Sequence, residues 1–318
     1  MDFLSDPEDR GYPVEYLLSR IRGRRSRLIA DWRQLAYRPG PIEPIASHRR
    51  GRPVSAETAW KDLAQEYQWV YTQMSRSLRE IFRPFFEYAE LRTLFICLRQ
   101  VKDKKAGRAA ELLNVSLLSD EIRHALMTGN DVLSAVSRVE RIFASQAPAL
   151  LGLEERYRSE GLRGVEQLLT NAFLTVIVST RLHPLIRSFF GRVIDSRNIM
   201  GLVKYTGMEF SALPTFLNNG SVPAARFTEI IGREDPSATI SLMREVSGIR
   251  LERNEPAQVE IALYTWISRY LKTAGRDPLN IGLIIDYLWR RSIEAMNLGV
   301  LHHGKDLERD AVIAALVA

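Results

Sequence analysis

The stretch IDSRNIMGLVK at residues 194–204 places an acidic residue, Asp195, three positions before an amide, Asn198, within a pattern of helical spacing. Residues three apart lie on one face of a helix, so these two side chains can meet each other or share a neighbour. Asparagine is a mediocre helix former because its side chain competes for backbone hydrogen bonds. Its position inside a long helix therefore predicts an assigned partner for the amide, either a neighbouring helix hairpin of the same chain or a partner chain.

The same pattern occurs three times when the sequence is aligned with itself, at offsets of 105 and 99 residues. The three pairs are Glu90 with Thr93, Asp195 with Asn198, and Glu294 with Asn297. Downstream of the first two pairs, Asn114 falls on Asn219 and Ser116 falls on Ser221, so a helix, a turn and a following helix recur together. We therefore expect three helical repeats of about a hundred residues, at 1–110, 111–215 and 216–318.

Apolar residues recur at helical spacing along most of the chain, whereas the period-two alternation typical of strands is nearly absent. The sequence predicts an all-α fold with three pseudo-repeated helical lobes. The predicted helices cover residues 14–35, 57–100, 117–126, 131–143, 161–179, 184–205, 223–231, 237–247, 257–273 and 278–301.

Length and composition are those of a folded globular protein. The chain has 318 residues, 46% of them apolar and 26% charged. A single cysteine, Cys97, excludes an internal disulfide and any cysteine-rich zinc site. The longest apolar run, residues 172–178, is far shorter than the roughly 20 residues that cross a bilayer. Residues 1–10 are acidic, unlike a secretory leader, so we expect a cytoplasmic protein.

Positive charge is concentrated near the start of the chain. The net charge is +6, and residues 20–52 contain ten arginines against Asp31 and Glu43. Part of this region, residues 37–53, carries prolines and glycines without a period and is predicted to be a loop. The patch is compatible with a solvated helix face and loop, with an acidic protein partner, or with nucleic acid.

Motifs for catalysis are missing from the sequence. It has no glycine-rich phosphate loop of the GxxxxGK[ST] or GxGxxG type, and no HExxH zinc motif. Adjacent His302 and His303 diverge by about 100° on a helix and rarely chelate one ion. We expect no catalytic residue, cofactor or metal, although an enzyme with a pocket between lobes stays as a third alternative.

Three segments together resemble one family. They are YLLSRIRGRRSRLI at 16–29, IDSRNIMGLVK at 194–204 and IIDYLWRRSIEAMNLGVLHHGK at 284–305. They are similar to the C subunit of V-type and archaeal-type ATPases, whose eukaryotic relative is the d subunit. The resemblance runs from about residue 12 to the end of the chain. The first repeat departs from the family pattern because Thr93 stands where asparagine is usual.

The resemblance implies a mechanical and non-catalytic role. A member of this family is a funnel-shaped, three-lobed rotor subunit that receives the central axle, sits on the membrane proteolipid ring and transmits torque for H⁺ or Na⁺ transport. The implied partners are the D-type and F-type axle subunits and the ring, on the cytoplasmic face of the membrane, with no nucleic acid and no substrate. The basic residues expected at these contacts are Arg22, Arg49, Arg50, Arg52 and Lys204.

A different class of function stays as the alternative. The chain would then be a soluble helical-repeat adaptor or a nucleic-acid-binding protein that uses the basic patch at residues 20–52. Binding to phosphate would weaken steeply as salt rises, which distinguishes this alternative from the rotor role.

Overall fold

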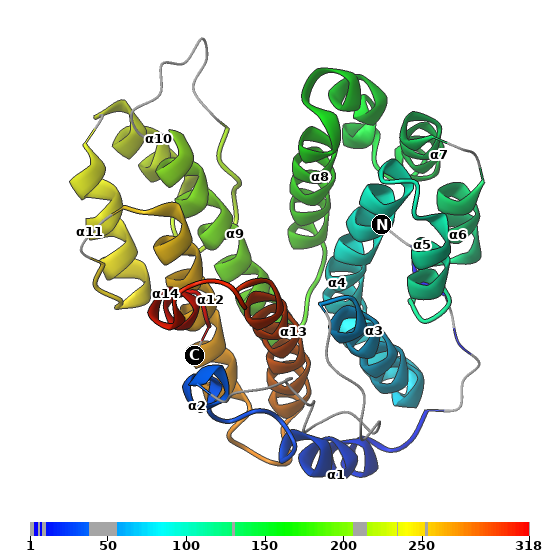
Figure 1. Ribbon diagram of the computed structural model, residues 1–318, viewed down its shortest axis with the longest axis horizontal. Coiled ribbons are helices and arrows are strands. Elements are labelled where there is room, and N and C mark those ends of the chain that lie inside the picture. The colour runs from blue at the N-terminus through cyan, green and yellow to red at the C-terminus, as the bar shows by residue number, and fades with distance from the viewer. Residues whose placement is uncertain are drawn as a thin grey trace. The chain divides into compact units, whose positions relative to one another are not determined.

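The computed structural model describes residues 3–5, 7, 11–37, 56–128, 131–205, 215–233, 235–251 and 254–317 (Figure 1). Over these ranges the secondary structure is helical, with two isolated β-bridges and no strand. The predicted all-α class is therefore confirmed. The helices are α1 Val14–Arg25, α2 Trp32–Tyr37, α3 Ala56–Gln73, α4 Arg76–Lys102, α5 Ala106–Leu113, α6 Asp120–Met127, α7 Val132–Ala144, the 3₁₀ turn η1 Pro148–Leu150, α8 Leu153–Ser179, α9 Pro184–Tyr205, α10 Ala224–Gly232, α11 Pro236–Ser247, α12 Pro256–Ala274, α13 Gly282–His303 and α14 Arg309–Ala314.

The chain divides into two compact units, each built from two stretches of sequence. The first unit comprises Met1–Val14 and Ala64–Ile186, and the second comprises Glu15–Leu63 and Arg187–Ala318. The N-terminal residues thus contribute to both units. The three lobes expected from the repeats stay a prediction.

In the first unit α4 packs against α5, α7 and α8. Its aromatic core includes Phe86, which meets Tyr71 edge-on with ring centroids 4.9 Å apart. Phe3, which is 1% exposed, lies edge-on to Phe143 at 5.2 Å and to Phe173 at 6.4 Å. Edge-to-face pairs of this kind are favourable beyond their buried area, so residue 3 anchors the start of the chain in this core.

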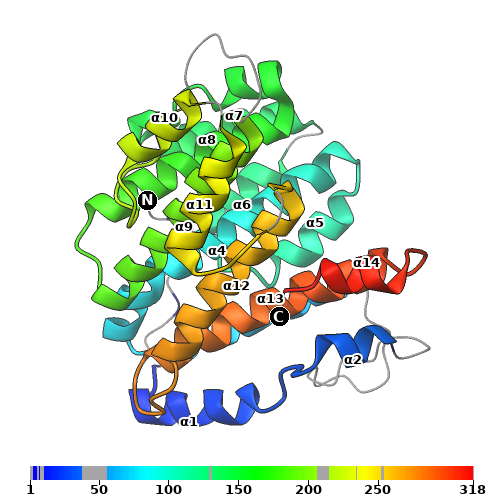
Figure 2. The ribbon, with the colours of Figure 1, turned by 90° about the vertical axis from the view of Figure 1, so that its left-hand side faces the viewer.

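In the second unit α12 and α13 form an antiparallel hairpin, and the two helices lie side by side in Figures 1 and 2. Helices α9, α10, α11 and α12 surround an apolar cluster that includes Phe227 and Leu263. A second cluster joins α2 to α13 and α14 through Leu35, Leu301 and Val312, and Figure 2 shows α2 beside α14. The N-terminal helices therefore pack on the C-terminal end of the chain.

Most predicted helices agree with the structure to within a few residues, and 184–205 coincides with α9. Two predicted helices are each divided. The range 14–35 breaks after Arg25 because the Asp31 carboxylate accepts the Gln34 N–H at 2.8 Å and so begins a new helix, α2. The range 57–100 breaks at Met74, where the backbone pairs with residue 12. Short helices α5 and α14 were not among the predicted elements.

Candidate functional site

In the second copy of the repeated motif, the Asp195 carboxylate holds a turn that lies 26 residues later in the chain. Asp195 is 0% exposed on α9. Its Oδ2 accepts hydrogen bonds from the N–H of Ser221, at 2.9 Å, and from the hydroxyl of the same residue, while Oδ1 accepts from the Val222 N–H at 3.2 Å. A Cβ at Gly220 would lie 2.1 Å from Oδ1, so the turn approaches the carboxylate as closely as it does only because residue 220 is glycine.

One helical turn further along α9, the Asn198 amide imitates a backbone peptide. Its Nδ2 donates to the Leu217 carbonyl at 2.8 Å, and its Oδ1 accepts from the Leu217 N–H at 2.9 Å. Both polar groups of the side chain therefore have hydrogen-bond partners within the chain.

The third copy repeats the amide contact and changes the partner of the acid. On α13, Asn297 Nδ2 donates to the Val317 carbonyl at 2.8 Å and Oδ1 accepts from the Val317 N–H at 3.0 Å. Glu294 accepts from the Ile29 N–H at 3.1 Å through Oε1 and from Arg291 through Oε2. The acid of the third copy therefore binds the N-terminal segment, 265 residues away in sequence.

The first copy makes the fewest contacts. Glu90, on α4, accepts from the Leu117 N–H at 2.9 Å through Oε1, 27 residues downstream, while its Oε2 is buried and has no hydrogen-bond partner. Thr93 is half-buried and carries a hydroxyl, which cannot reproduce the two-way pairing of an amide. The Ser116 hydroxyl, at the position of Ser221, donates instead to the Leu113 carbonyl.

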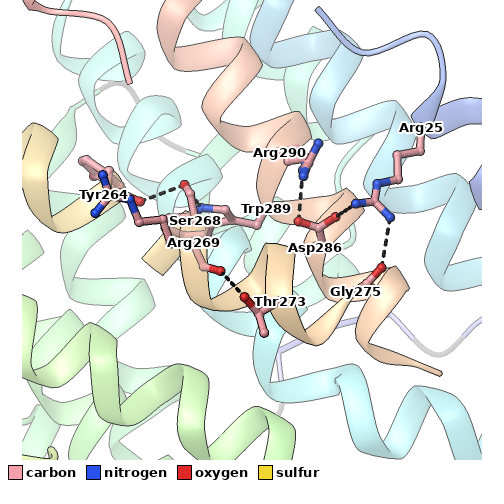
Figure 3. A network of polar contacts seen from close by, with 9 residues as sticks. All are labelled: Arg25, Tyr264, Ser268, Arg269, Thr273, Gly275, Asp286, Trp289 and Arg290. Carbon is pink, nitrogen blue, oxygen red and sulfur yellow. Dashed lines mark hydrogen bonds and ion pairs between the residues drawn. The ribbon is translucent and has the colours of Figure 1, made fainter. Parts of the chain in front are cut away.

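A buried ion pair that the sequence reasoning missed joins α1 to the α12–α13 hairpin (Figure 3). Asp286 on α13 lies 2.8 Å from Arg25 Nη2 and accepts from Arg290 Nε at 2.9 Å. Arg25 also donates to the Gly275 carbonyl at 3.1 Å. Asp286 precedes Arg290 by four residues, which is the available sequence signal for that half of the network. The contact with residue 25 has no comparable local signature.

The predicted basic contact residues are only partly described. Arg22 on α1 and Lys204 near the end of α9 are exposed. Arg49, Arg50 and Arg52, together with most of the predicted loop 37–53, lie outside the described residues. Among the sequence-predicted residues, the structure thus brings each acid and amide of the second and third copies onto backbone groups of the same chain.

The arrangement does not expose reactive groups to a solute. The carboxylates of Asp195 and Glu294 are buried and their oxygens accept hydrogen bonds from within the chain, which leaves them no access to an external proton donor or acceptor. Burial raises the pKa of the Cys97 thiol to about 12, with a further contribution from the Glu90 charge, so the thiol is protonated and unreactive near neutral pH. The described residues contain no group of three or more histidine, cysteine, aspartate or glutamate side chains that could hold a metal ion.

Two further features concern ligands and membranes. The first unit has an open cavity of about 650 Å³ between the start of α4 and the end of α8, and its charged lining includes Glu80, Arg83, Glu87 and Arg181. Glu87 is paired there with Arg83 at 3.4 Å. Of the helices described here, none has the length and apolar character needed to span a bilayer.

Comparison with known proteins gives a consistent result. Residues 44–314 match the family described as ATP synthase (C/AC39) subunit. The chain is also 22% identical, over 331 aligned residues, to the C subunit of the A-type ATP synthase of Methanothermobacter thermautotrophicus, in an alignment that covers 92% of this chain and 84% of that protein. The chain therefore belongs to the ATP synthase (C/AC39) subunit family.

Proposed function

We propose that this protein is a non-catalytic rotor subunit of a V/A-type ATPase, which joins the central axle to the membrane proteolipid ring and transmits torque for ATP-coupled H⁺ or Na⁺ transport. The single observation that carries the proposal is the family match, which extends over residues 44–314. The partners proposed are the D-type and F-type axle subunits and the ring. The protein would act on the cytoplasmic face of the membrane, held there by other subunits.

The hydrogen bonds of the repeated motif support a mechanical role. In the second and third copies, buried side chains connect one helix to a backbone segment that is distant in sequence. Buried and fully satisfied polar networks rigidify the structure around them. A force applied to α9 or α13 would thus be passed to the attached segment through these hydrogen bonds, as a torque-transmitting part requires.

The exposed basic residues are proposed as contacts to acidic groups on the partners. Arg22 and Lys204 belong to this set by their exposure, and Arg49, Arg50 and Arg52 by their place in the arginine-rich sequence. Charged contacts at the rim of an interface mainly change the association rate and its dependence on salt. Association through these residues should therefore weaken as ionic strength rises.

The experiment is co-purification of the tagged chain from its own membranes, with partners identified by mass spectrometry. Recovery of axle subunits and a proteolipid is expected. Recovery of nucleic acid or of unrelated soluble proteins, without either type of ATPase subunit, would overturn the rotor role and support the adaptor alternative.

A second arm tests the basic contacts. Two variants are compared with the unmodified chain. One carries the triple change Arg49→Ala, Arg50→Ala and Arg52→Ala, and the other carries Arg22→Ala with Lys204→Ala. Each variant should lower recovery of the partners and reduce the salt sensitivity of that recovery. Arg233→Ala on α10 is a matched control, because it also removes one exposed arginine, there paired with Glu229. Equal recovery for all variants and the control would show that the chosen residues are not at the contacts.

A further inference from the structure

The first copy of the motif differs from the others in how its buried acid is satisfied. The Glu90 residue is 1% exposed, and its Oε1 accepts a hydrogen bond from the Leu117 N–H. Its Oε2 is enclosed without a partner. In the second copy the corresponding Asp195 accepts from three donors. A buried carboxylate with an unsatisfied oxygen is unfavourable, whereas the neutral acid is tolerated much better.

The surroundings of Glu90 explain the shortage of donors. The Ser116 hydroxyl, which could have served the carboxyl group as Ser221 does in the second copy, donates to the Leu113 carbonyl. Besides the Leu117 N–H, the groups that act on the Glu90 carboxyl are the Thr93 hydroxyl on the same helix, through a side-chain hydrogen bond, and the charge of Arg123 on α6. Arg123 is engaged elsewhere, since it donates to the Ser116 carbonyl at 2.9 Å and to Asp120 at 3.1 Å.

The environment of the Glu90 carboxyl group changes its pKa. Burial raises the pKa of Glu90 from 4.5 to about 7, and the hydrogen bonds from Leu117 and Thr93 and the charge of Arg123 only partly oppose the rise. The Cys97 thiol stays neutral in the same range because burial raises its pKa to about 12. The raised pKa of Glu90 therefore lies near neutral pH, whereas that of Cys97 lies well above it.

The turn that Glu90 holds also carries the start of the chain. The Leu117 carbonyl accepts the Ser5 N–H at 2.8 Å, and the Ser119 N–H donates to the Phe3 carbonyl at 2.8 Å. A second contact runs from the Ser5 hydroxyl to the Leu118 carbonyl at 2.9 Å. One residue, Leu117, thus connects the buried acid to the N-terminal segment Phe3–Ser5.

We propose that Glu90 is a proton-dependent clamp: with a proton bound it holds the turn at Leu117 and the attached segment Phe3–Ser5, and without the proton both loosen. The clamp belongs to the first unit alone, and it does not depend on the rotor role proposed above. It would make attachment of the N-terminal segment sensitive to the pH around the protein.

The sign of the effect is fixed by the direction of the shift. A carboxyl group that titrates at 4.5 in the opened chain and at about 7 in the folded chain stabilises the folded form fully below pH 4.5, and that stability is lost as the pH rises to about 7. Between about pH 6 and about pH 8 the local opening equilibrium should increase about tenfold.

The test compares the unmodified full chain with Glu90→Gln, which imitates the protonated acid. Cys97 is the single cysteine of the chain and is buried in the same unit, so its labelling by a thiol reagent reports local opening. Comparing the two proteins at the same pH cancels the ionisation of the thiol itself. The ratio of their labelling rates should rise about tenfold from about pH 6 to about pH 8. Hydrogen exchange of the Ser5 amide, compared in the same way, should rise with it.

The controls separate the possible outcomes. Glu166→Gln in the same unit removes the acid of the exposed Arg99 pair and should leave the pH effect unchanged. A constant labelling ratio would show that Glu90 does not exchange a proton in this range and would overturn the proposal. Faster labelling of Cys97 with unchanged exchange at Ser5 would refute the link to the N-terminal segment. If Glu90→Gln does not fold, the infrared band of a protonated carboxyl group in the unmodified chain decides, since it must disappear between the same two pH values.

Discussion

The second and third copies of the motif use the same residue types to close loops of very different length. On α9, Asp195 and Asn198 both bind the segment that directly follows, at residues 217–222. On α13, Asn297 binds Val317 nearby, but Glu294 binds Ile29, at the other end of the chain. The comparison shows that an acid-and-amide helix face can hold the peptide groups of a facing segment, and that sequence distance does not determine which segment it holds.

The largest expected effect is at the acid of the local clamp. Asp195→Ala removes three hydrogen bonds to one turn and leaves the buried N–H of Val222 and the part-buried N–H of Ser221 without their side-chain acceptor. We expect a loss of about 4 kcal/mol in the free energy of unfolding, measured by urea titration. A loss below about 1 kcal/mol would show that the turn finds water instead, and that the clamp is not what holds it.

The two amides provide the next comparison. Asn297→Ala should lower the free energy of unfolding by about 2–3 kcal/mol and Asn198→Ala by about 1–2 kcal/mol. The difference arises because Val317 is buried, whereas Leu217 is half-buried and can exchange its lost bonds for water. If either variant melts like the unmodified chain but fails to assemble with partners, the amide belongs to an interface and not to the fold.

Removing Arg25, the more exposed member of the ion pair between α1 and α13, should have a smaller effect on stability. Arg25→Met removes one arginine from Asp286 and the donor to Gly275, but Asp286 retains Arg290. We expect a loss of about 1–2 kcal/mol together with faster hydrogen exchange in α1. Arg226→Met, which breaks the exposed pair with Glu245 in the same unit, should leave the unfolding transition where it was. Equal losses in the free energy of unfolding for Arg25→Met and Arg226→Met would show that the pair with Asp286 is no more stabilising than the exposed pair with Glu245.

The smallest effects are expected at two exposed helix caps, one in each unit. Hydrogen bonds from the Ser134 side chain and backbone lower the pKa of Asp131 at the start of α7, and those from Ser237 lower the pKa of Asp235 at the start of α11. Their stabilisation is present above pH 3.8 and is lost as the pH falls through the lowered values. Asp131→Ala and Asp235→Ala should reduce the steepness of acid unfolding slightly, as followed by circular dichroism; an increase would contradict the capping role.

Residues in long periodic helices were predictable, and contacts between distant segments were not. Helix α9 was predicted to its ends because Pro184 opens it and its apolar spacing continues to residue 205. The self-alignment also selected the acids and amides that make the buried contacts, since an unfavourable residue recurring at one register marks a side-chain partner.

Some features of the structure were not predicted from the sequence, and each has a physical reason for being missed. The break between α1 and α2 depends on one capping carboxylate, Asp31, which is outweighed by the apolar spacing around it. Helix α14 is six residues long, too short to show a period. The Asp286 pair and the Ile29 contact join residues more than 250 positions apart, and they arise from tertiary packing, which no local pattern encodes.

The packing of the first helices on the last ones sets the order in which the chain can fold during synthesis. Leu35 on α2 is synthesised long before its partners Leu301 on α13 and Val312 on α14. Domains generally fold as units while the chain grows. The first unit can therefore form while the apolar faces of α1 and α2 are still exposed to solvent. We expect a chaperone to bind these two helices during that interval.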